Sequence, residues 1–306
     1  MALLHLRVVA PKETADAVVE VLHHHQGAIA VHLAGETSDG WVVTADLARE
    51  CVDALLAELH RLDVASHGLI SLEPLDTTIG VLADRAERDA PGEADDAVIW
   101  DELAARTGED STLTGTFVAF MVLATLLASI GVVTDSPVTI VGAMVVGPEF
   151  GPLASVAVGI VRRRADLARR GAIALLAGFP AAILVTSLLS LLARAVGLIH
   201  PGDISGVNRQ TEFIYHPGWF SLITALVAGT AGMLSLTSSK SAALVGVFIS
   251  VTTIPAAGNA AVGGVLGKWN ETWQSLAQLG INLVGITAAG VATLLVLRGA
   301  ARARAN

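Results

Sequence analysis

Hydrophobic residues gather in long runs over the last two thirds of the chain, and each run is long enough to cross a bilayer as a helix. Gly and Ala are dense in every run, which permits close packing between helices. The pattern predicts six membrane spans, at residues 112–133, 137–161, 171–199, 217–237, 241–266 and 273–298.

The first 79 residues follow a different pattern, in which short strand-like and helix-like segments alternate. Apolar and polar positions alternate as in half-buried strands at residues 4–8, 29–33, 41–45 and 68–75. A turn-rich stretch at 35–40 joins the second and third of these strands, while residues 15–25 and 51–62 each carry an apolar helical stripe. The order βαββαβ predicts a ferredoxin-like domain over residues 1–79.

An acidic segment separates the two patterns. Residues 80–111 are polar, contain Pro91-Gly92, and carry a short helical pattern near residues 94–106. We interpret this segment as a linker with a membrane-adjacent helix, and residues 112–306 as the membrane domain.

The second apolar run is interrupted at its middle by Gly147-Pro148-Glu149-Phe150-Gly151-Pro152. Each proline removes an N–H donor and clashes with the preceding turn, so one continuous helix is excluded. A carboxylate at such depth costs about 2.5–3.5 kcal/mol on insertion scales and needs a partner. Non-helical backbone survives at membrane depth only where protein or a wet cavity meets it. The run therefore predicts a discontinuous helix built around a site.

The fifth run contains a second interruption, Thr252-Thr253-Ile254-Pro255-Ala256-Ala257-Gly258-Asn259. It offers hydroxyls and an amide where the first interruption offers a carboxylate. We expect a substrate site between the two breaks, formed by Gly147, Glu149, Gly151, Thr252, Thr253, Gly258 and Asn259.

The two halves of the membrane domain resemble each other at an offset of 104 residues. Val141-Gly142 then falls on Val245-Gly246, and the run at 157–159 falls on the run at 261–263. Three spans per copy, an odd number, place the copies in opposite orientations, as in many secondary transporters. We therefore predict two inverted repeats, at about 112–199 and 217–298, with broken helices in spans 2 and 5.

Charge supports a membrane assignment and sets the expected orientation. The connection after the second run holds five arginines, Lys240 follows the fourth run, and three more arginines close the chain. The opposite side has mainly Arg209 and Lys268, so the rule that positive loops stay inside predicts that both termini are cytoplasmic. The first 110 residues carry 22 acidic against seven basic residues, which argues against nucleic-acid binding.

Candidate chemistry beyond the breaks is sparse. The single cysteine, Cys51, excludes an intramolecular disulfide and a cysteine-rich metal site. No His-Glu-x-x-His motif, Walker loop or second carboxylate at membrane depth is present. We therefore expect no enzyme activity, no cofactor and no metal.

The run Val141–Pro152, the arginine-rich loop after it and the small preceding αβ domain carry a family resemblance. The chain resembles the bacterial and archaeal uncharacterised hydrophobic-domain membrane proteins, known as domain of unknown function 389. The resemblance implies an inner-membrane protein whose N-terminal domain is regulatory, and it implies little chemistry.

The sequence favours an inner-membrane transporter or permease for a small polar solute, with a nucleoside-like metabolite as one candidate. Two alternatives stay open. One is a channel of the same architecture, and the other is a membrane-tethered sensor whose N-terminal domain binds an effector. The small soluble domain and the Gly/Ala-rich helices also lead us to expect a homo-oligomer.

Overall fold

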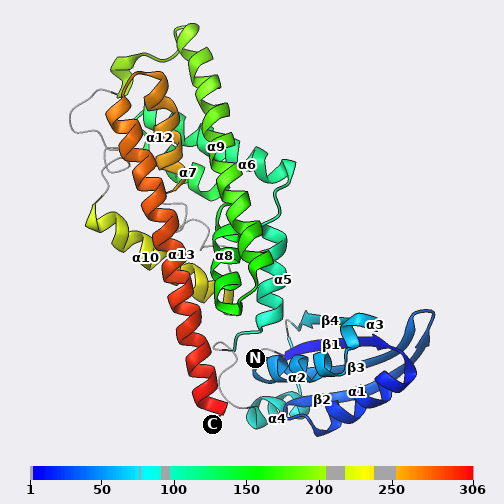
Figure 1. Cartoon of the computed structure of the whole chain (residues 1–306). Coiled ribbons are helices and arrows are strands. Elements are labelled where there is room, and N and C mark those ends of the chain that lie inside the picture. Colours follow the sequence, from blue (N-terminus) through cyan, green and yellow to red (C-terminus); the bar gives the residue numbers. More distant parts are fainter. Residues whose placement is uncertain (1–2, 76, 91–96, 205–217, 238–252, 306) are drawn as a thin grey trace. The chain divides into compact units, whose positions relative to one another are not determined.

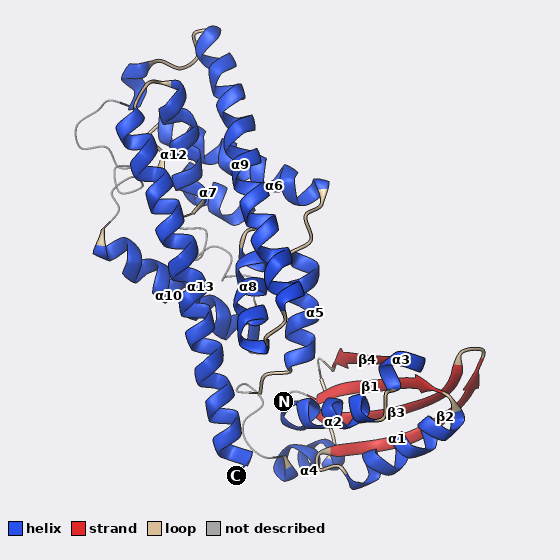
Figure 2. Cartoon of the chain, in the orientation of Figure 1, coloured by secondary structure: helices blue, strands red, loops and turns tan. Residues whose placement is uncertain are grey.

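The computed structural model describes residues 3–75, 77–90, 97–204, 218–237 and 253–305 of the chain (Figure 1). These residues form two compact units, and each is considered by itself. One is built mainly from residues before Leu103, and the other from Leu103 through Arg298. The protein is mostly helical, with one small sheet in the N-terminal unit (Figure 2).

The N-terminal unit is a four-stranded sheet with helices packed on it. Its strands are β1 (Leu3–Ala10), β2 (Ala28–Thr37), β3 (Gly40–Ala48) and β4 (Leu69–Pro74). They lie in the order β2-β3-β1-β4, and all neighbours pair antiparallel. The main helices are α1 (Lys12–His24) and α2 (Arg49–Arg61), and a short α3 (Val64–His67) precedes β4.

Alternation along β1 places the core on one face of the sheet. Leu4, Leu6 and Val8 are buried in one cluster with the apolar stripes of α1 and α2. The opposite face of the sheet is more polar, and His5 Nδ1 lies 2.7 Å from Asp46 Oδ1 there. The predicted strands and helices of this unit thus occur at the expected places in the chain.

Two parts of the N-terminal third differ from the sequence expectation. The stretch at 35–40 is not a long connection, because β2 continues to Thr37 and pairs with Gly40 across a two-residue turn. The segment taken as a linker contains two helices, α4 (Val81–Asp89) and α5 (Trp100–Asp110). Ala83 and Ala86 of α4 are buried beside Cys51 in a small apolar cluster, which explains why a polar sequence is helical here.

The second unit consists of apolar helices. They are α6 (Gly115–Val133), α7 (Pro137–Val146), α8 (Phe150–Arg162), α9 (Ala165–Ala195), α10 (Trp219–Thr237), α12 (Ile254–Val265) and α13 (Trp269–Ala305), with a 3-10 turn at Pro201–Ile204. Within the described ranges, four helices are long and apolar enough to cross a membrane, and five crossings result if the bent pair α7 and α8 is one span. The protein is therefore a multi-pass membrane protein.

The outward surface of these helices is itself apolar. Leu184, Leu188 and Leu192 of α9 are more than half exposed, as are Val284 and Val296 of α13. Large apolar patches are rare on soluble monomers, whereas lipid tails can cover them. The core between the helices is made instead from small residues such as Ala124, Ala128 and Ala182.

The first predicted break is present. α7 ends at Val146, α8 begins at Phe150, and the two helices are bent by 53°. α12 begins at Ile254 with a proline in its first turn, where the second break was expected. Residues 238–252, including Thr252, lie outside the described part of the chain, so the fifth predicted span is seen only in its second half.

Glycines let α8 and α9 approach closely around a tight turn. A Cβ built on Gly159 would lie 2.5 Å from the amide nitrogen of Ala168, and one built on Gly171 would lie 2.4 Å from the carbonyl oxygen of Pro152. Both obstacles are backbone atoms, which cannot move aside as a flexible side chain can.

The variant Gly159→Ala is expected to lower the stability of the protein by about 1–3 kcal/mol, since the added methyl overpacks this contact. Thermal unfolding of the detergent-solubilised chain measures the change. The matched control is Gly142→Ala, because nothing lies within 4 Å of a Cβ at Gly142. Alanine also favours helix at that position, so its unfolding temperature should not fall. Equal losses in the two variants would contradict the packing account.

Candidate functional site

The two expected breaks meet through one hydrogen bond. The hydroxyl of Thr253 donates to Oε1 of Glu149 at 2.7 Å, and both side chains are fully buried. Glu149 is the residue directly before α8, and Thr253 is the residue directly before α12. The structure therefore brings together the carboxylate and one hydroxyl that the sequence proposed for a common site.

The local sequence explains why a carboxylate is placed here. The first turn of a helix has N–H groups without partners inside the helix, and it carries the positive end of the helix dipole. Both α8 and α12 begin at this point, with Phe150 and Ile254 as their first residues. An acidic oxygen acceptor is therefore well suited to the junction, and the Thr253 hydroxyl supplies a further donor.

The glycines predicted for the site have different surroundings. Gly147 ends α7 in an extended conformation that lets the chain leave the helix. A Cβ on Gly151 would lie 2.4 Å from Cβ of Asp110, the last residue of α5. A Cβ on Gly258 would lie 2.6 Å from Cβ of Ala128 in α6. Gly151 and Gly258 thus serve close helix contacts. Partial desolvation raises the pKa of the Asp110 carboxyl.

Asn259 lies away from the Glu149–Thr253 bond. It is six residues beyond Thr253 on α12, which corresponds to about 9 Å along the helix axis. Its Nδ2 donates to Oγ of Ser275 in α13 at 2.8 Å, and both residues are buried. The predicted set is therefore divided between the break and a second polar contact farther along α12.

A polar group on α10 and α13 was missed by the sequence reasoning. Nε2 of Gln278 donates to Oγ of Ser221, and the same hydroxyl donates to Oδ1 of Asn282 at 3.0 Å. Gln278 and Asn282 are buried. Their signal in the sequence is the spacing of Ser275, Gln278 and Asn282, which repeats at three and four residues and places them on one face of an apolar helix.

No cluster of three or more His, Cys, Asp or Glu side chains that could hold a metal occurs among the described residues. The buried polar groups of the membrane unit are instead hydroxyls, amides and the carboxylate of Glu149. Each of these groups can donate or accept hydrogen bonds.

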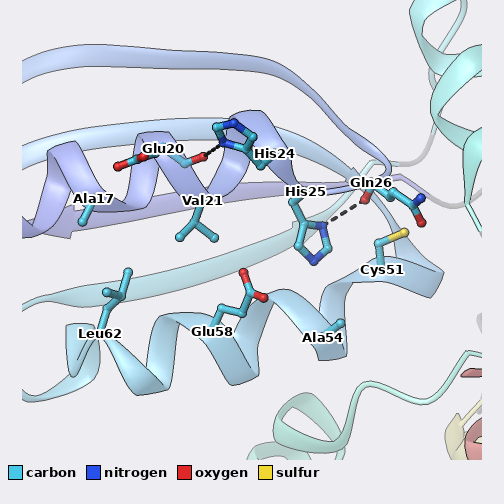
Figure 3. Close-up of a pocket in the computed structure, with 10 residues that line it drawn as sticks. All are labelled: Ala17, Glu20, Val21, His24, His25, Gln26, Cys51, Ala54, Glu58 and Leu62. Carbon is cyan, nitrogen blue, oxygen red and sulfur yellow. Dashed lines mark hydrogen bonds between the residues drawn. The ribbon is translucent and has the colours of Figure 1, made fainter.

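The N-terminal unit has a groove of about 580 Å³ between α1 and α2. Its lining residues are Ala17, Glu20, Val21, His24, His25, Gln26, Cys51, Ala54, Glu58 and Leu62. Figure 3 shows His25 from the end of α1 and Glu58 from α2 pointing toward each other across this space. The Nδ1 atoms of His24 and His25 donate to backbone carbonyls of Glu20 and Gln26. Each imidazole thus keeps its other nitrogen available.

Cys51 stands at the edge of this groove as a protonated thiol. Burial, with a smaller contribution from the nearby Glu50, raises the pKa of the thiol to about 11. A thiolate is the reactive form of cysteine, so this residue is packing rather than a nucleophile.

The membrane helices, the break and the small αβ unit define a class of multi-pass membrane protein. Residues 144–288 match the family described as Domain of unknown function (DUF389). The match agrees with the family resemblance that the run at 141–152 indicated. An uncharacterised protein of Methanocaldococcus jannaschii is 25% identical over 230 residues, which cover 74% of this chain and 67% of that protein. No solved structure matches the chain.

The Glu149–Thr253 bond is expected to be energetically coupled. Thr253→Val leaves the buried carboxylate without this donor and should cost about 1–3 kcal/mol of stability. Once Glu149→Gln has been introduced, the same threonine change should cost less. Unfolding of the two single variants and the double variant measures the interaction. Additive losses would show that the bond contributes nothing.

Alkylation of Cys51 by iodoacetamide is expected to be slow at neutral pH and to accelerate only as the pH approaches 11, since the thiol must first lose its proton. Because Cys51 is the single cysteine, mass spectrometry of the peptide that contains it separates this reaction from alkylation of amines and imidazoles elsewhere. A free cysteine peptide provides the reference, with its rate rising near its ordinary pKa of about 8.5. Equal rates for protein and peptide at neutral pH would contradict the assignment.

Proposed function

We propose that this protein is a transporter that moves a small polar solute across the bacterial or archaeal cytoplasmic membrane. Its site lies at the junction of two broken helices, which belong to two inverted repeats of three spans each. The observation that carries the proposal is the hydrogen bond between Glu149 and Thr253, two residues that stand 104 positions apart. That separation is the repeat offset predicted from the sequence.

Helix boundaries support the repeat. α6 and α10 each have 19 residues, and their first residues are Gly115 and Trp219. α8 and α12 begin at Phe150 and Ile254, and α9 and α13 begin at Ala165 and Trp269. Every one of these pairs has the same offset as the Glu149–Thr253 pair.

Backbone details at the two helical hairpins agree with the same offset. The amide of Arg164 donates to the carbonyl of Gly159 at 2.8 Å, and the amide of Lys268 donates to the carbonyl of Gly263 at 2.8 Å. Arg163 and Gly267, one residue earlier in each turn, both have a left-handed backbone, with φ of 56° and 80°. The α8–α9 and α12–α13 connections are therefore built alike.

Contacts between the two halves occur in a reciprocal pair. The Arg194 guanidinium donates to the carbonyl of Val265, and the Arg298 guanidinium donates to the carbonyl of Val161 at 2.9 Å. Adding 104 to Arg194 gives Arg298, and subtracting 104 from Val265 gives Val161, so the offset converts the first contact into the second. Such an exchange of roles is characteristic of a two-fold relation. The same operation returns the Glu149–Thr253 pair to itself, so a pseudo-two-fold axis would pass through that bond.

The direction of the helices supports inversion of the repeats. Ser187 and then Arg194 of α9 contact the carbonyls of Ala261 and then Val265 of α12, so α9 and α12 run in the same direction. α13 turns back on α12 at their hairpin. α9 and α13, which occupy the same place in their repeats, therefore run in opposite directions, as inverted-topology repeats require.

In this proposal α12 forms the second half of the fifth span, which brings the total to six, and both termini are cytoplasmic. The substrate binds where Glu149 and Thr253 contact each other and replaces that contact. Broken helices at such a junction offer N–H and carbonyl groups to a solute, as in other secondary transporters. The N-terminal unit would be a ferredoxin-like regulatory domain, which its strand order β2-β3-β1-β4 supports. A homo-oligomer and the absence of enzyme activity remain parts of the same proposal.

A membrane-tethered sensor is the second candidate, and the groove between α1 and α2 is the observation that favours it. An anchor alone gives no reason for a carboxylate buried between two helix ends. A permanently open channel is less favoured, because Glu149 and Thr253 close the junction between the breaks.

The purified chain in liposomes is expected to support counterflow, in which an internal unlabelled solute drives uptake of the same labelled solute. Uridine, adenosine and myo-inositol form the first panel of small polar probes. Glu149→Gln should lower the rate about tenfold or more, because the junction loses its charged acceptor.

The control is Thr287→Val, whose hydroxyl donates only to the carbonyl of Leu283 on its own helix. Rates that stay unchanged in Glu149→Gln and in Asn259→Ala would remove these residues from the mechanism. Flux without counterflow would identify a channel.

A further inference from the structure

The two proposed repeats differ in chemistry at the contact between α10 and α13 as well as at the break. In the second repeat, Ser221 of α10 lies against Gln278 and Asn282 of α13. The positions at the repeat offset in the first repeat are Phe117, Ala174 and Gly178, and Phe117 packs directly on Gly178 there. An apolar contact in one half is thus replaced by three hydrogen-bonding side chains in the other.

Hydrogen bonding within this polar group is incomplete. The Ser221 hydroxyl uses its one hydrogen on Asn282 and accepts from the Gln278 amide. Oε1 of Gln278 is buried and has no hydrogen-bond partner among the residues that the structure describes. Exchanging the two ends of the amide would not remove the problem, because the Gln278 nitrogen would then be the atom without a partner. A buried polar atom in this state costs about 1–3 kcal/mol.

Ser275, Gln278 and Asn282 form a polar stripe along α13, and this stripe leads toward the break. Near the hairpin, Gly263 of α12 lies against Thr272, and Asn259 is bonded to Ser275. Because α12 and α13 are antiparallel neighbours, each step back along α12 corresponds to a step forward along α13. This register places Asn282 at about the level of Thr253, where α12 begins and the bond to Glu149 is made.

The stripe carries no charged side chain between Ser275 and Asn282. Glu271 precedes it in the first turn of α13, where a carboxylate complements the helix dipole. Amides and hydroxyls donate and accept hydrogen bonds without contributing charge. A ligand that fits them must supply hydrogen-bond donors, above all one for the Gln278 carbonyl oxygen.

We infer that Ser221, Asn259, Ser275, Gln278 and Asn282 form the recognition surface for a neutral solute that bears several hydroxyl or amide N–H donors. The inference rests on the proposed transport function and specifies its substrate class. Gln278 contacts the solute. The stripe lines the part of the solute's route that runs along α13 toward the Glu149–Thr253 junction. At the offset positions of the first repeat only Ser155 is polar, and the others are Phe117, Gly171, Ala174 and Gly178. Recognition is therefore asymmetric although the fold is repeated.

Interhelical hydrogen bonding is the competing explanation, since buried amides and hydroxyls also hold membrane helices together. It predicts that removal of the Gln278 amide changes stability and leaves ligand affinity unaltered. A binding measurement on a near-isosteric variant therefore separates the two explanations.

The test is ligand-induced thermal stabilisation of the full chain in detergent. The probes are uridine, adenosine and myo-inositol as neutral donors, uridine 5′-monophosphate as an anion, and choline as a cation. At least one neutral probe should raise the unfolding temperature, and the charged probes should not. In Gln278→Met the apparent affinity for that neutral probe should fall about tenfold or more. Ser221→Ala should weaken it in the same direction, and Thr287→Val, on the same helix, should leave it unchanged.

Stabilisation by charged probes only, by no neutral probe, or equally in Gln278→Met and the unaltered chain would overturn the inference. If Gln278→Met does not fold, Ser221→Ala decides by the same criterion. Counterflow of the binding probe tests the proposed function separately. Counterflow that needs Glu149 but is unaffected by Gln278→Met would support the transport function and contradict the recognition role of the stripe. Binding that needs Gln278, in the absence of any counterflow, would support the recognition role of the stripe and contradict the transport function.

Discussion

The hydrogen bond from Thr253 to Glu149 is the contact around which the membrane unit is arranged. A buried carboxylate is unfavourable in an apolar environment, so the surrounding structure must provide donors and oriented dipoles. Two helices begin beside it, and each brings the positive end of its dipole to the same place. The start of both helices beside Glu149 therefore fits the burial of its carboxylate.

The rest of the unit makes that junction possible by close approach of helices. Gly258 allows α12 to lie against Ala128 and Ser129 of α6, and Gly151 allows α8 to lie against the end of α5. Alanine side chains fill the remaining space, as at Ala124 and Ala257. Small residues bring backbones together where lipid offers no hydrophobic driving force between helices.

Much of this architecture could be predicted from the sequence, because its causes are local. Apolar runs predict membrane helices, and Pro148 predicts a break in the helix whatever packs around it, because proline lacks the N–H donor. The sequence placed Glu149 and Thr253 in one expected site, but the direct hydrogen bond between them depends on the fold. The helix α4 was not predicted, since its polar sequence is stabilised by burial of Ala83 and Ala86 beside Cys51. Gln278 and Asn282 were overlooked because isolated amides in an apolar run resemble ordinary interhelical contacts until their partner Ser221 is known.

The carbonyl contacts of Arg194 and Arg298 have a consequence for the two short helices that end there. α12 has 12 residues and α8 has 13, so each is about 18–20 Å long, shorter than a hydrocarbon layer about 30 Å thick. The last carbonyls of such a helix have no partner within the helix. A guanidinium from a longer helix reaches those oxygens at Val265 and Val161. The C-terminal end of each short helix is thereby held by a cation, which also complements the negative end of its dipole.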